Sequence, residues 1–182
     1  MDPVLTYSLL GLGLVVVGLI LLVATRPSDF KIERSAVMAA PAAAIFAKIN
    51  DFHQWENWSP WAKLDPAMKS TYEGPASGEG SIYGWSSASN KVGEGRMTLT
   101  KSRPSELIGI QLDFIRPMAC TNQVEFTLRP EGQGTAVTWA MTGKNGFVAK
   151  AFHMMMNIDK MVGDDFAKGL AQLKTLVETS GK

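Results

Sequence analysis

Apolar residues near the carboxyl end of the chain recur at helical spacing. Between residues 147 and 178 they are three or four positions apart, and the charged residues fall between them. This pattern is typical of an amphipathic helix with one buried face. Because Asn157 and Asp159 can cap a new helix start, we predict a short helix followed by a long one. The predicted buried stripe comprises Val148, Phe152, Met155, Ile158, Val162, Phe166, Leu170, Leu173 and Val177.

The middle of the chain has the period of strands. Between Met68 and Thr142, clusters of Gly, Pro, Ser and Asn separate six short segments, in which no long helix fits. Short connections predict an antiparallel meander with one apolar face, which the long helix would cover. A strand starting at Phe30 and a short helix opened by Pro41 precede it. Alternation is clearest in residues 108–114, 124–128 and 137–141.

The amino-terminal segment is apolar and uncharged from Val4 to Ala24, a run of 21 residues. At ~1.5 Å per residue a helix of this length covers about 32 Å, the thickness of the hydrocarbon core of a bilayer. A cleaved signal peptide is the alternative, but such peptides have a basic start, and only Met1, Asp2 and Pro3 precede this run. We therefore predict a transmembrane anchor over residues 1–25 and one folded domain over residues 26–182.

The charge around this segment predicts its orientation. Arg26, Lys31 and Arg34 follow the apolar run, and neither Lys nor Arg precedes it. The positive-inside tendency then places the folded domain on the cytoplasmic side of a membrane crossed once.

Composition narrows the choice of ligands. The formal net charge is +1, too small for the basic footprint of a nucleic-acid-binding protein, so we expect no nucleic acid partner. One cysteine, Cys120, and two histidines provide few ligands for zinc, so we expect neither a metal nor a cofactor.

Three tryptophans, Trp55, Trp58 and Trp61, fall within seven positions. Together with Trp85 they can form an aromatic mouth over a ligand. The alternative is that they close one end of the sheet as core, which we favour because aromatic clusters usually pack against one another. Five methionines can likewise either line a pliable pocket or pack against the helices as core. They are Met141, Met154, Met155, Met156 and Met161.

Two glycines lie inside the predicted long helix, where each costs roughly 1 kcal/mol relative to alanine. Gly163 and Gly169 can permit a close approach to the sheet or a ligand, or simply fit under a bulky neighbour. The sequence does not separate these alternatives.

No catalytic motif is present. The chain has no Gly-x-Ser-x-Gly elbow, no His-Glu-x-x-His, no phosphate-binding loop and no paired-cysteine motif. His53, beside Asp51 and Glu56, can act as a general base if buried, but a solvated histidine is the favoured interpretation. The other acid–base candidates are His153, Asp113, Asp159, Asp164 and Asp165. We predict no catalytic residue.

The order of elements and several motifs resemble a known family. The motifs are Ala40-Pro41, Asp51-Phe-x-x-Trp55-x-x-Trp58-Ser-Pro-Trp61, Gly93-x-Gly95, Gly134-Thr135-x-Val-Thr-Trp139 and Gly169-Leu-x-x-Leu173-Lys. From Phe30 to Glu178 the chain resembles the SRPBCC superfamily, in its polyketide cyclase/dehydrase and lipid-transport-like branch. This resemblance implies an α+β helix-grip fold, in which a curved antiparallel sheet of about seven strands wraps round the carboxy-terminal helix and encloses an apolar cavity.

Relatives in this superfamily bind lipids, sterols, polyketides or other hydrophobic molecules, a few are enzymes, and some activate chaperones. We therefore expect a membrane-anchored protein that binds or transports a hydrophobic small molecule or lipid. The alternatives are a cyclase- or dehydratase-like enzyme and a protein-binding module resembling chaperone activators. The expected ligand-binding residues are Trp55, Trp58, Trp61, Trp85, Met97, Ile110, Phe114, Phe126, Trp139, Met155, Val162 and Phe166.

Overall fold

The computed structural model describes residues 3–89 and 91–179. Two compact units form, one from Met1–Phe30 with Lys144–Ile158 and the other from Lys31–Gly143 with Asp159–Lys182. The first unit contains helices α1 (Pro3–Ala24) and α3 (Phe147–Met155). The second contains most of the sheet and of helix α4 (Ile158–Thr179).

The sheet has seven strands in the order β1-β7-β6-β5-β4-β3-β2. From β2 to β7 each strand pairs antiparallel with the next, which is the predicted meander. The strands are β1 (Asp29–Met38), β2 (Lys69–Glu73), β3 (Ile82–Ser86), β4 (Glu94–Arg103), β5 (Leu107–Arg116), β6 (Cys120–Glu131) and β7 (Gly134–Lys144).

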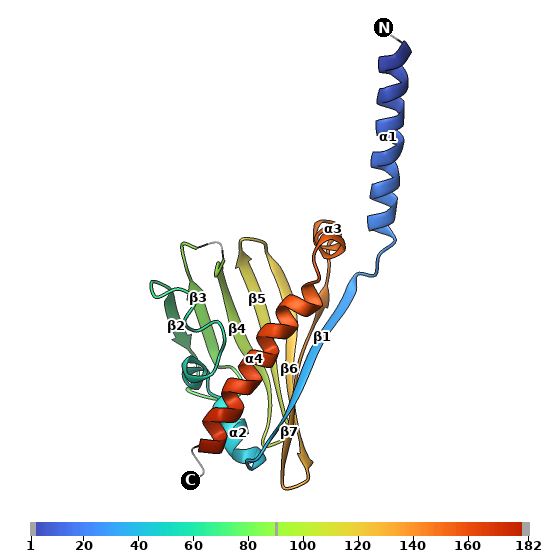
Figure 1. Ribbon diagram of the computed structural model, residues 1–182. Coiled ribbons are helices and arrows are strands. Elements are labelled where there is room, and N and C mark those ends of the chain that lie inside the picture. Colours follow the sequence, from blue (N-terminus) through green and yellow to red (C-terminus); the bar gives the residue numbers. More distant parts are fainter. Residues whose placement is uncertain (1–2, 90, 180–182) are drawn as a thin grey trace. The chain divides into compact units, whose positions relative to one another are not determined.

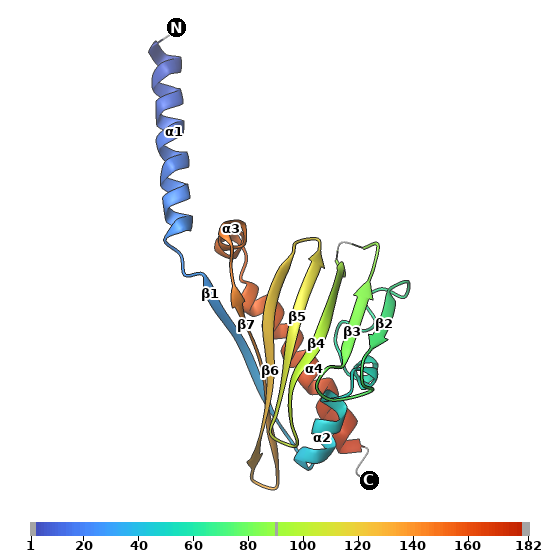
Figure 2. The ribbon, with the colours of Figure 1, turned by 180° about the vertical axis from the view of Figure 1, so that it is seen from behind.

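The first and last strands are neighbours, so the chain crosses from one edge of the sheet to the other between β1 and β2. Helix α2 (Ala42–Ile49) and the 3-10 helix η1 (Phe52–Asn57) lie in this crossing. Helix α4 runs diagonally across one face of the curved sheet, as both ribbon views show (Figures 1 and 2). We call this face the inner face. The arrangement confirms the predicted α+β helix-grip fold.

The core lies between the inner face and α4. Strand register brings Ile108, Phe126 and Trp139 into one cross-strand row, and Leu99, Ile110, Val124 and Met141 into the next. All seven side chains are buried. Helix α4 contributes Phe166, Leu170, Leu173 and Val177, which are also buried and follow the predicted stripe. The ring of Phe166 stacks on that of Trp139, with centroids 4.3 Å apart.

The predicted break near Asn157 is confirmed, because α3 ends at Met155 and α4 begins at Ile158. The predicted burial of Val148 and Phe152 is wrong. Val148 and Phe152 are 58% and 53% exposed. The break makes α3 a separate helix in the other unit, so its apolar face does not continue the face that α4 buries.

The two helical glycines fit under bulky neighbours. A Cβ atom on Gly169 would lie 2.8 Å from Cζ3 of Trp139 and 3.0 Å from Cδ of Pro60. A Cβ atom on Gly163 would collide with the guanidinium group of Arg34. Arg34 in turn pairs with Asp159 at 3.1 Å, which brings β1 against the start of α4. Glycine at both positions therefore permits close packing of α4 on Trp139 and Pro60 at one point and on Arg34 at the other.

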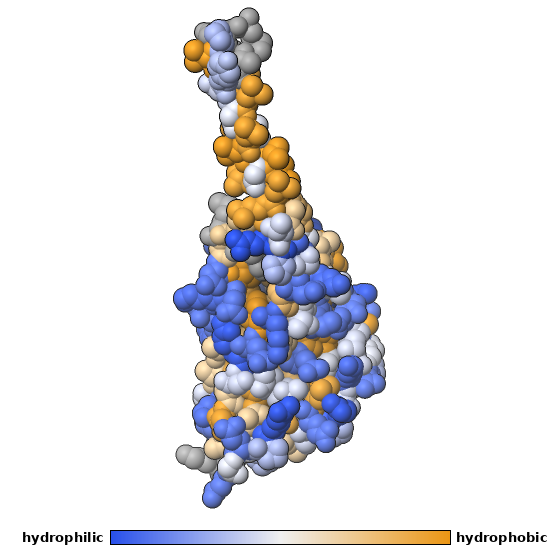
Figure 3. Space-filling view, turned by 90° about the vertical axis from the view of Figure 1, so that its right-hand side faces the viewer, coloured by the Kyte–Doolittle hydropathy of each residue, from blue (hydrophilic) through white to orange (hydrophobic). Residues whose placement is uncertain are grey.

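Helix α1 is long and apolar enough to cross a membrane. Its window Tyr7–Ala24 has a mean hydropathy of 2.6, and apolar residues predominate along the helix in Figure 3. Most of its large apolar side chains are exposed, whereas Val23 is buried. A helix that is apolar on every side has the composition of a membrane span or of a signal sequence.

Candidate functional site

One end of the inner face is closed by an aromatic cluster. Trp58 and Trp139 are 1% and 2% exposed, and Trp55 and Phe126 are also buried. Their rings meet mostly edge to face, with centroids 4.7–6.2 Å apart. Aromatic pairs in this geometry add to the stabilisation from buried area. This end of the inner face is therefore packed core, and we call it, with the buried rows of Ile108 and Ile110, the packed half.

Two of these tryptophans also complete helix α2. The last carbonyl groups of a helix lack partners within the helix. Trp55 Nε1 donates to the carbonyl oxygen of Ile49 at 2.9 Å, and Trp58 Nε1 donates to that of Lys48 at 3.1 Å. Both indoles thus pack the core and satisfy the end of α2, which agrees with the structural interpretation of this motif.

The other end of the inner face is only half covered. Register places Tyr83, Met97 and Leu112 side by side on adjacent strands, and Trp85 and Phe114 flank Gly95 in the next row. These five side chains are all half-buried, although they continue the same apolar rows. We call this set of five residues the open half of the inner face. Strands β4 and β5 run from the open half directly into the packed half.

Gly95 makes room for one wall of the open half. A Cβ atom at this position would lie 2.5 Å from the backbone oxygen of Asp113 and 2.6 Å from the ring of Trp85. The indole instead lies over the glycine, meets Phe114 edge to face at 5.8 Å, and donates from Nε1 to the carbonyl oxygen of Val92 at 3.2 Å. This contact explains the Gly93-x-Gly95 motif in part, since a larger residue at Gly95 would displace Trp85.

Two polar groups lie on the inner face, one beside the open half and one in the packed half. Asn122 is 7% exposed and sits opposite Leu112, and its Nδ2 atom is 4.0 Å from Sγ of Cys120. The Nε1 atom of Trp139 is buried without a hydrogen-bond partner among the described residues. Buried polar atoms usually have a partner, so this donor is an exception within the packed half.

The predicted ligand-binding residues divide between the two halves. Trp85, Met97 and Phe114 belong to the open half, and Trp61 and Val162 are also half-buried. The others belong to the packed half, namely Trp55, Trp58, Ile110, Phe126, Trp139 and Phe166. The side chain of Met155 lies outside the described part of the structure.

Sequence reasoning missed three residues that lie with this set. Tyr83 and Leu112 complete the open half, and Asn122 supplies a polar group beside it. Asn122 lies two positions before Val124 on β6, and Val124 lies two positions before Phe126. The two-residue period of a strand therefore already placed Asn122 on the inner face.

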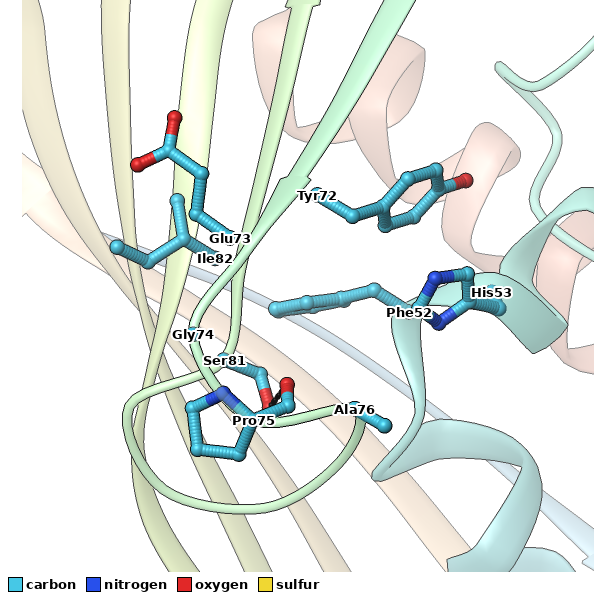
Figure 4. A pocket seen from close by; sticks show the side chains of 9 residues that line it. All are labelled: Phe52, His53, Tyr72, Glu73, Gly74, Pro75, Ala76, Ser81 and Ile82. Atoms are coloured by element: carbon cyan, nitrogen blue, oxygen red, sulfur yellow. Dashed lines mark hydrogen bonds between the residues drawn. The ribbon is translucent and has the colours of Figure 1, made fainter.

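A separate pocket of about 250 Å³ lies at the edge of the sheet beside η1. Figure 4 shows its lining, with η1 on one side and β2, β3 and the loop between them on the other. The lining residues are Phe52, His53, Tyr72, Glu73, Gly74, Pro75, Ala76, Ser81 and Ile82. No sequence motif pointed to this pocket, because it depends on the approach of η1 to the β2–β3 loop.

Three polar side chains of this pocket, those of His53, Tyr72 and Ser81, already have hydrogen-bond partners. Asp51 Oδ1 accepts from both the backbone N–H and Nδ1 of His53, each at 2.9 Å, and thereby caps η1. The imidazole stacks on the ring of Tyr72 at 4.1 Å. Partial burial and the nearby Glu56 carboxylate raise the pKa of Tyr72 to about 12, so its hydroxyl remains a proton donor at neutral pH. Ser81 Oγ donates to the carbonyl oxygen of Pro75 at 2.9 Å.

The remaining acid–base candidates are dispersed. Asp159 pairs with Arg34, and Asp164 pairs with Lys160 at 2.6 Å. Asp113 lies on the outer face of the sheet. Burial opposes its ionisation, but hydrogen bonds from Thr121 and Gln111 and the charge of Arg96 keep its pKa below the ordinary value. Asp165 is half-buried on α4, and the side chain of His153 lies outside the described part.

Metal binding has no candidate site in the described residues, where no group of three or more His, Cys, Asp or Glu side chains is arranged to hold an ion.

Comparison with solved structures confirms the fold. The Aha1 dimer from Colwellia psychrerythraea matches with a TM-score of 0.59 and 16% identity, over 82% of this chain and 96% of that one. Protein MLL2253 from Mesorhizobium loti matches with a TM-score of 0.60 and 13% identity, over 82% and 98% of the two chains. DynU16, from the dynemicin biosynthetic locus, matches with a TM-score of 0.57 and 12% identity, over 82% and 48%. At these identities the likeness concerns the fold alone.

Sequence comparison identifies the family. A search of curated proteins gave no significant match. A family model described as polyketide cyclase / dehydrase and lipid transport matches residues 29–178, which is the whole of the sheet and nearly all of α4. The protein therefore belongs to the polyketide cyclase/dehydrase and lipid transport family.

Proposed function

We propose that this protein is a membrane-anchored carrier of a hydrophobic small molecule such as a lipid or fatty acid. The guest lies on the open half of the inner face, between the sheet and α4, and α1 holds the protein in the bilayer. The family and the fold support a ligand-binding or cyclase-like role. Lipid cargo and membrane anchoring are our proposal.

The observation that carries the proposal is the change in burial along the inner face. Leu99 and Ile110 are buried, whereas Met97 and Leu112, the next residues on the same face of the same strands, are half-buried. Apolar side chains left partly uncovered inside a fold are available to an apolar guest. Burying further apolar area on a ligand gains about 25 cal/mol per Å².

Each part of the site has a role in this proposal. Trp61, Trp85, Met97, Phe114 and Val162 contact the guest directly, together with Tyr83 and Leu112. The packed half, including Trp58 and Phe126, forms a rigid floor, because buried side chains reach a guest only after rearrangement. Asn122 supplies a hydrogen bond to the polar end of the guest, the usual arrangement in an apolar ligand site.

A matched pair of substitutions tests the site. Leu112→Trp fills the open half, and Gln123→Trp adds the same side chain on the outer face, where Gln123 is exposed. Native mass spectrometry of the full chain released from detergent measures the fraction that carries a lipid or fatty acid. We expect this fraction to fall at least about tenfold in Leu112→Trp and to be unchanged in Gln123→Trp, with little loss of stability in either variant.

Three results would contradict the proposal. The first is unmodified protein that carries no lipid after expression and takes none up from added lipid. The second is equal lipid occupancy in both variants. The third is strong destabilisation by Leu112→Trp, because overpacking of a filled site costs ~1–3 kcal/mol and would show that the open half has no room.

The pocket beside η1 supports a second candidate, a cyclase- or dehydratase-like enzyme. The imidazole of His53, with Asp51 as its hydrogen-bond partner, borders this half-open pocket, and a general base needs such a partner beside a substrate site. Because His53 is exposed and Asp51 already caps η1, we rank this candidate second. Replacing His53 with Gln would abolish turnover of a polyketide substrate if the enzyme interpretation holds, and would leave lipid occupancy unchanged if the carrier interpretation holds.

A further inference from the structure

Helix α3 exposes an apolar face. Phe147 and Val148, in its first turn, are 50% and 58% exposed, and Phe152 and Met154 are also exposed. At 100° per residue these four side chains fall within one arc of about 160°, with Ala151 between them. Lys150 lies at the edge of this arc. Exposed aromatic and aliphatic side chains gathered on one side of a short helix mark a surface that another phase or partner covers. We call these four residues the α3 face.

The start of α3 is held beside the end of α1. The two helices belong to the same compact unit, and their Cα atoms approach within 8 Å. The backbone N–H of Asn145, just before α3, donates to the carbonyl oxygen of Ser28 at 2.7 Å. Ser28 lies only four residues beyond Ala24, the last residue of α1. The helix with the exposed apolar face is thus tethered to the point at which the chain leaves the apolar span.

The charges of this unit match a lipid surface. Arg26 follows α1, Lys144 precedes α3, and Lys150 borders the α3 face, so these basic residues outnumber Asp29, the acidic residue among the described residues of the unit. Amphipathic helices that lie in the membrane interface combine an apolar face inserted at the headgroup boundary with flanking basic residues. The basic residues attract anionic headgroups of the same leaflet.

We propose that α3 is a second membrane contact, an interfacial helix that inserts Phe147, Val148 and Phe152 into the bilayer leaflet at which α1 ends. This inference rests on the proposed anchoring by α1 and extends it. A span alone leaves the rest of a protein free to pivot at the membrane surface. A second, amphipathic contact beside the span restricts that motion and makes the contact sensitive to the lipid composition of one leaflet.

Depth measurements on the full chain test the proposal. Single cysteines at Val148 and Phe152, introduced with Cys120→Ser, carry an environment-sensitive fluorophore in nanodiscs of phosphatidylcholine and phosphatidylglycerol. Lipids with a quencher on the acyl chain report insertion, and iodide reports exposure to water. Leu14→Cys in α1 is the control for bilayer depth, and Lys168→Cys on the exposed side of α4 is the control for an aqueous site.

We expect the labels at 14, 148 and 152 to be quenched from the acyl chain and the label at 168 to be quenched by iodide. A label at 14 quenched by lipid with labels at 148 and 152 quenched by iodide would overturn the inference and leave the anchor intact. A label at 14 quenched by iodide would refute the anchor, and the inference with it. Labels at 148 and 152 shielded from both quenchers would mean that protein covers the α3 face, which also overturns the inference.

Lipid charge provides a second readout. Raising the fraction of phosphatidylglycerol should deepen the label at Val148, and Lys144→Glu with Lys150→Glu should remove this dependence. An unchanged response in the double variant would contradict the role of the basic residues. Lipid occupancy of the open half, measured as above, should be the same in Phe152→Glu as in the unmodified chain, so the carrier proposal and this inference fail separately.

Discussion

Replacement of Gly169 by alanine probes how tightly α4 is packed on the inner face. A Cβ atom there would lie 2.8 Å from Cζ3 of Trp139 and 3.0 Å from Cδ of Pro60. Trp139 is buried and stacks on Phe166 with an interplanar angle of 6°, so its ring has no free space to move into. The new methyl group must therefore push α4 or the ring out of place.

The magnitude follows from two opposing effects. Alanine is better than glycine inside a helix by about 1 kcal/mol. Overpacking of a close-packed core costs ~1–3 kcal/mol. We therefore expect a net loss of up to about 2 kcal/mol in the free energy of unfolding of Gly169→Ala.

Gly163→Ala is the matched control on the same helix. Its helix propensity gain is the same, but its Cβ atom meets the guanidinium of Arg34, the end of a flexible side chain. Moving Arg34 disturbs its hydrogen bonds to the carbonyl oxygens of Glu33 and Asp159 and its ion pair with the Asp159 carboxylate, and a solvent-accessible ion pair contributes about 0–1 kcal/mol. We expect Gly163→Ala to be neutral or slightly more stable than the unmodified protein.

Thermal unfolding of the full chain in detergent, followed by tryptophan fluorescence, measures the comparison. For a chain of this size 1 kcal/mol corresponds to roughly 2–4 °C in Tm. Gly169→Ala should melt several degrees below Gly163→Ala. If both variants melt at the same temperature, or Gly169→Ala melts higher, the packing of α4 on Trp139 is not as tight as the structure indicates.

Three further predictions concern single contacts. Trp58→Phe removes the donor to the Lys48 carbonyl oxygen and should reduce the free energy of unfolding by at least about 1 kcal/mol. Trp61→Phe is the control and should have a smaller effect, because Trp61 is only half-buried. Equal losses in the two variants would contradict the role of the Trp58 hydrogen bond. The hydrogen bond from the Ala39 N–H, together with Lys174, lowers the pKa of Glu178. The ionised carboxylate therefore stabilises the fold fully at a pH above the ordinary pKa of glutamate. This stabilisation is lost as the pH falls through the lowered pKa. Urea denaturation between pH 7 and 3 measures the free energy of unfolding, which should fall less with pH in Glu178→Gln than in Glu125→Gln, an exposed control on the outer face. An equal fall in both variants would show that Glu178 does not contribute to the acid sensitivity. Gly95→Ala should displace the ring of Trp85 and disturb the strand pairing beside Asp113, and we expect lipid occupancy to fall about tenfold, equivalent to 1.4 kcal/mol. Unchanged occupancy in native mass spectrometry would exclude this part of the open half from the site.

Local periodicity was sufficient to predict most of the fold. Alternation in β5, β6 and β7 placed Ile110, Phe126 and Trp139 on one face, and the three- and four-residue steps placed Phe166 and Leu170 on the facing side of α4. Asn157 marked the break between α3 and α4 because a capping residue acts on its own helix. These features depend on neighbours in sequence, so the sequence contains them.

The site was predicted less well, because alternation treats all inward residues alike. Ile110 and Phe114 have the same parity on β5, yet the first is buried and the second is half-buried. The difference depends on where α4, Trp55 and Trp58 lie over the sheet. The same limit applies to Tyr72, which β2 brings onto His53 from 19 positions away.

By itself, the sequence determined the apolar span, the strand and helix periods, and the family to which the chain belongs. Only the tertiary structure decided which half of the inner face is packed and which half is open, why Gly163 and Gly169 are tolerated in α4, and that the apolar side of α3 is uncovered. The physical reason is that a residue's period dictates the direction in which its side chain points, whereas burial depends on which distant segment arrives to cover it.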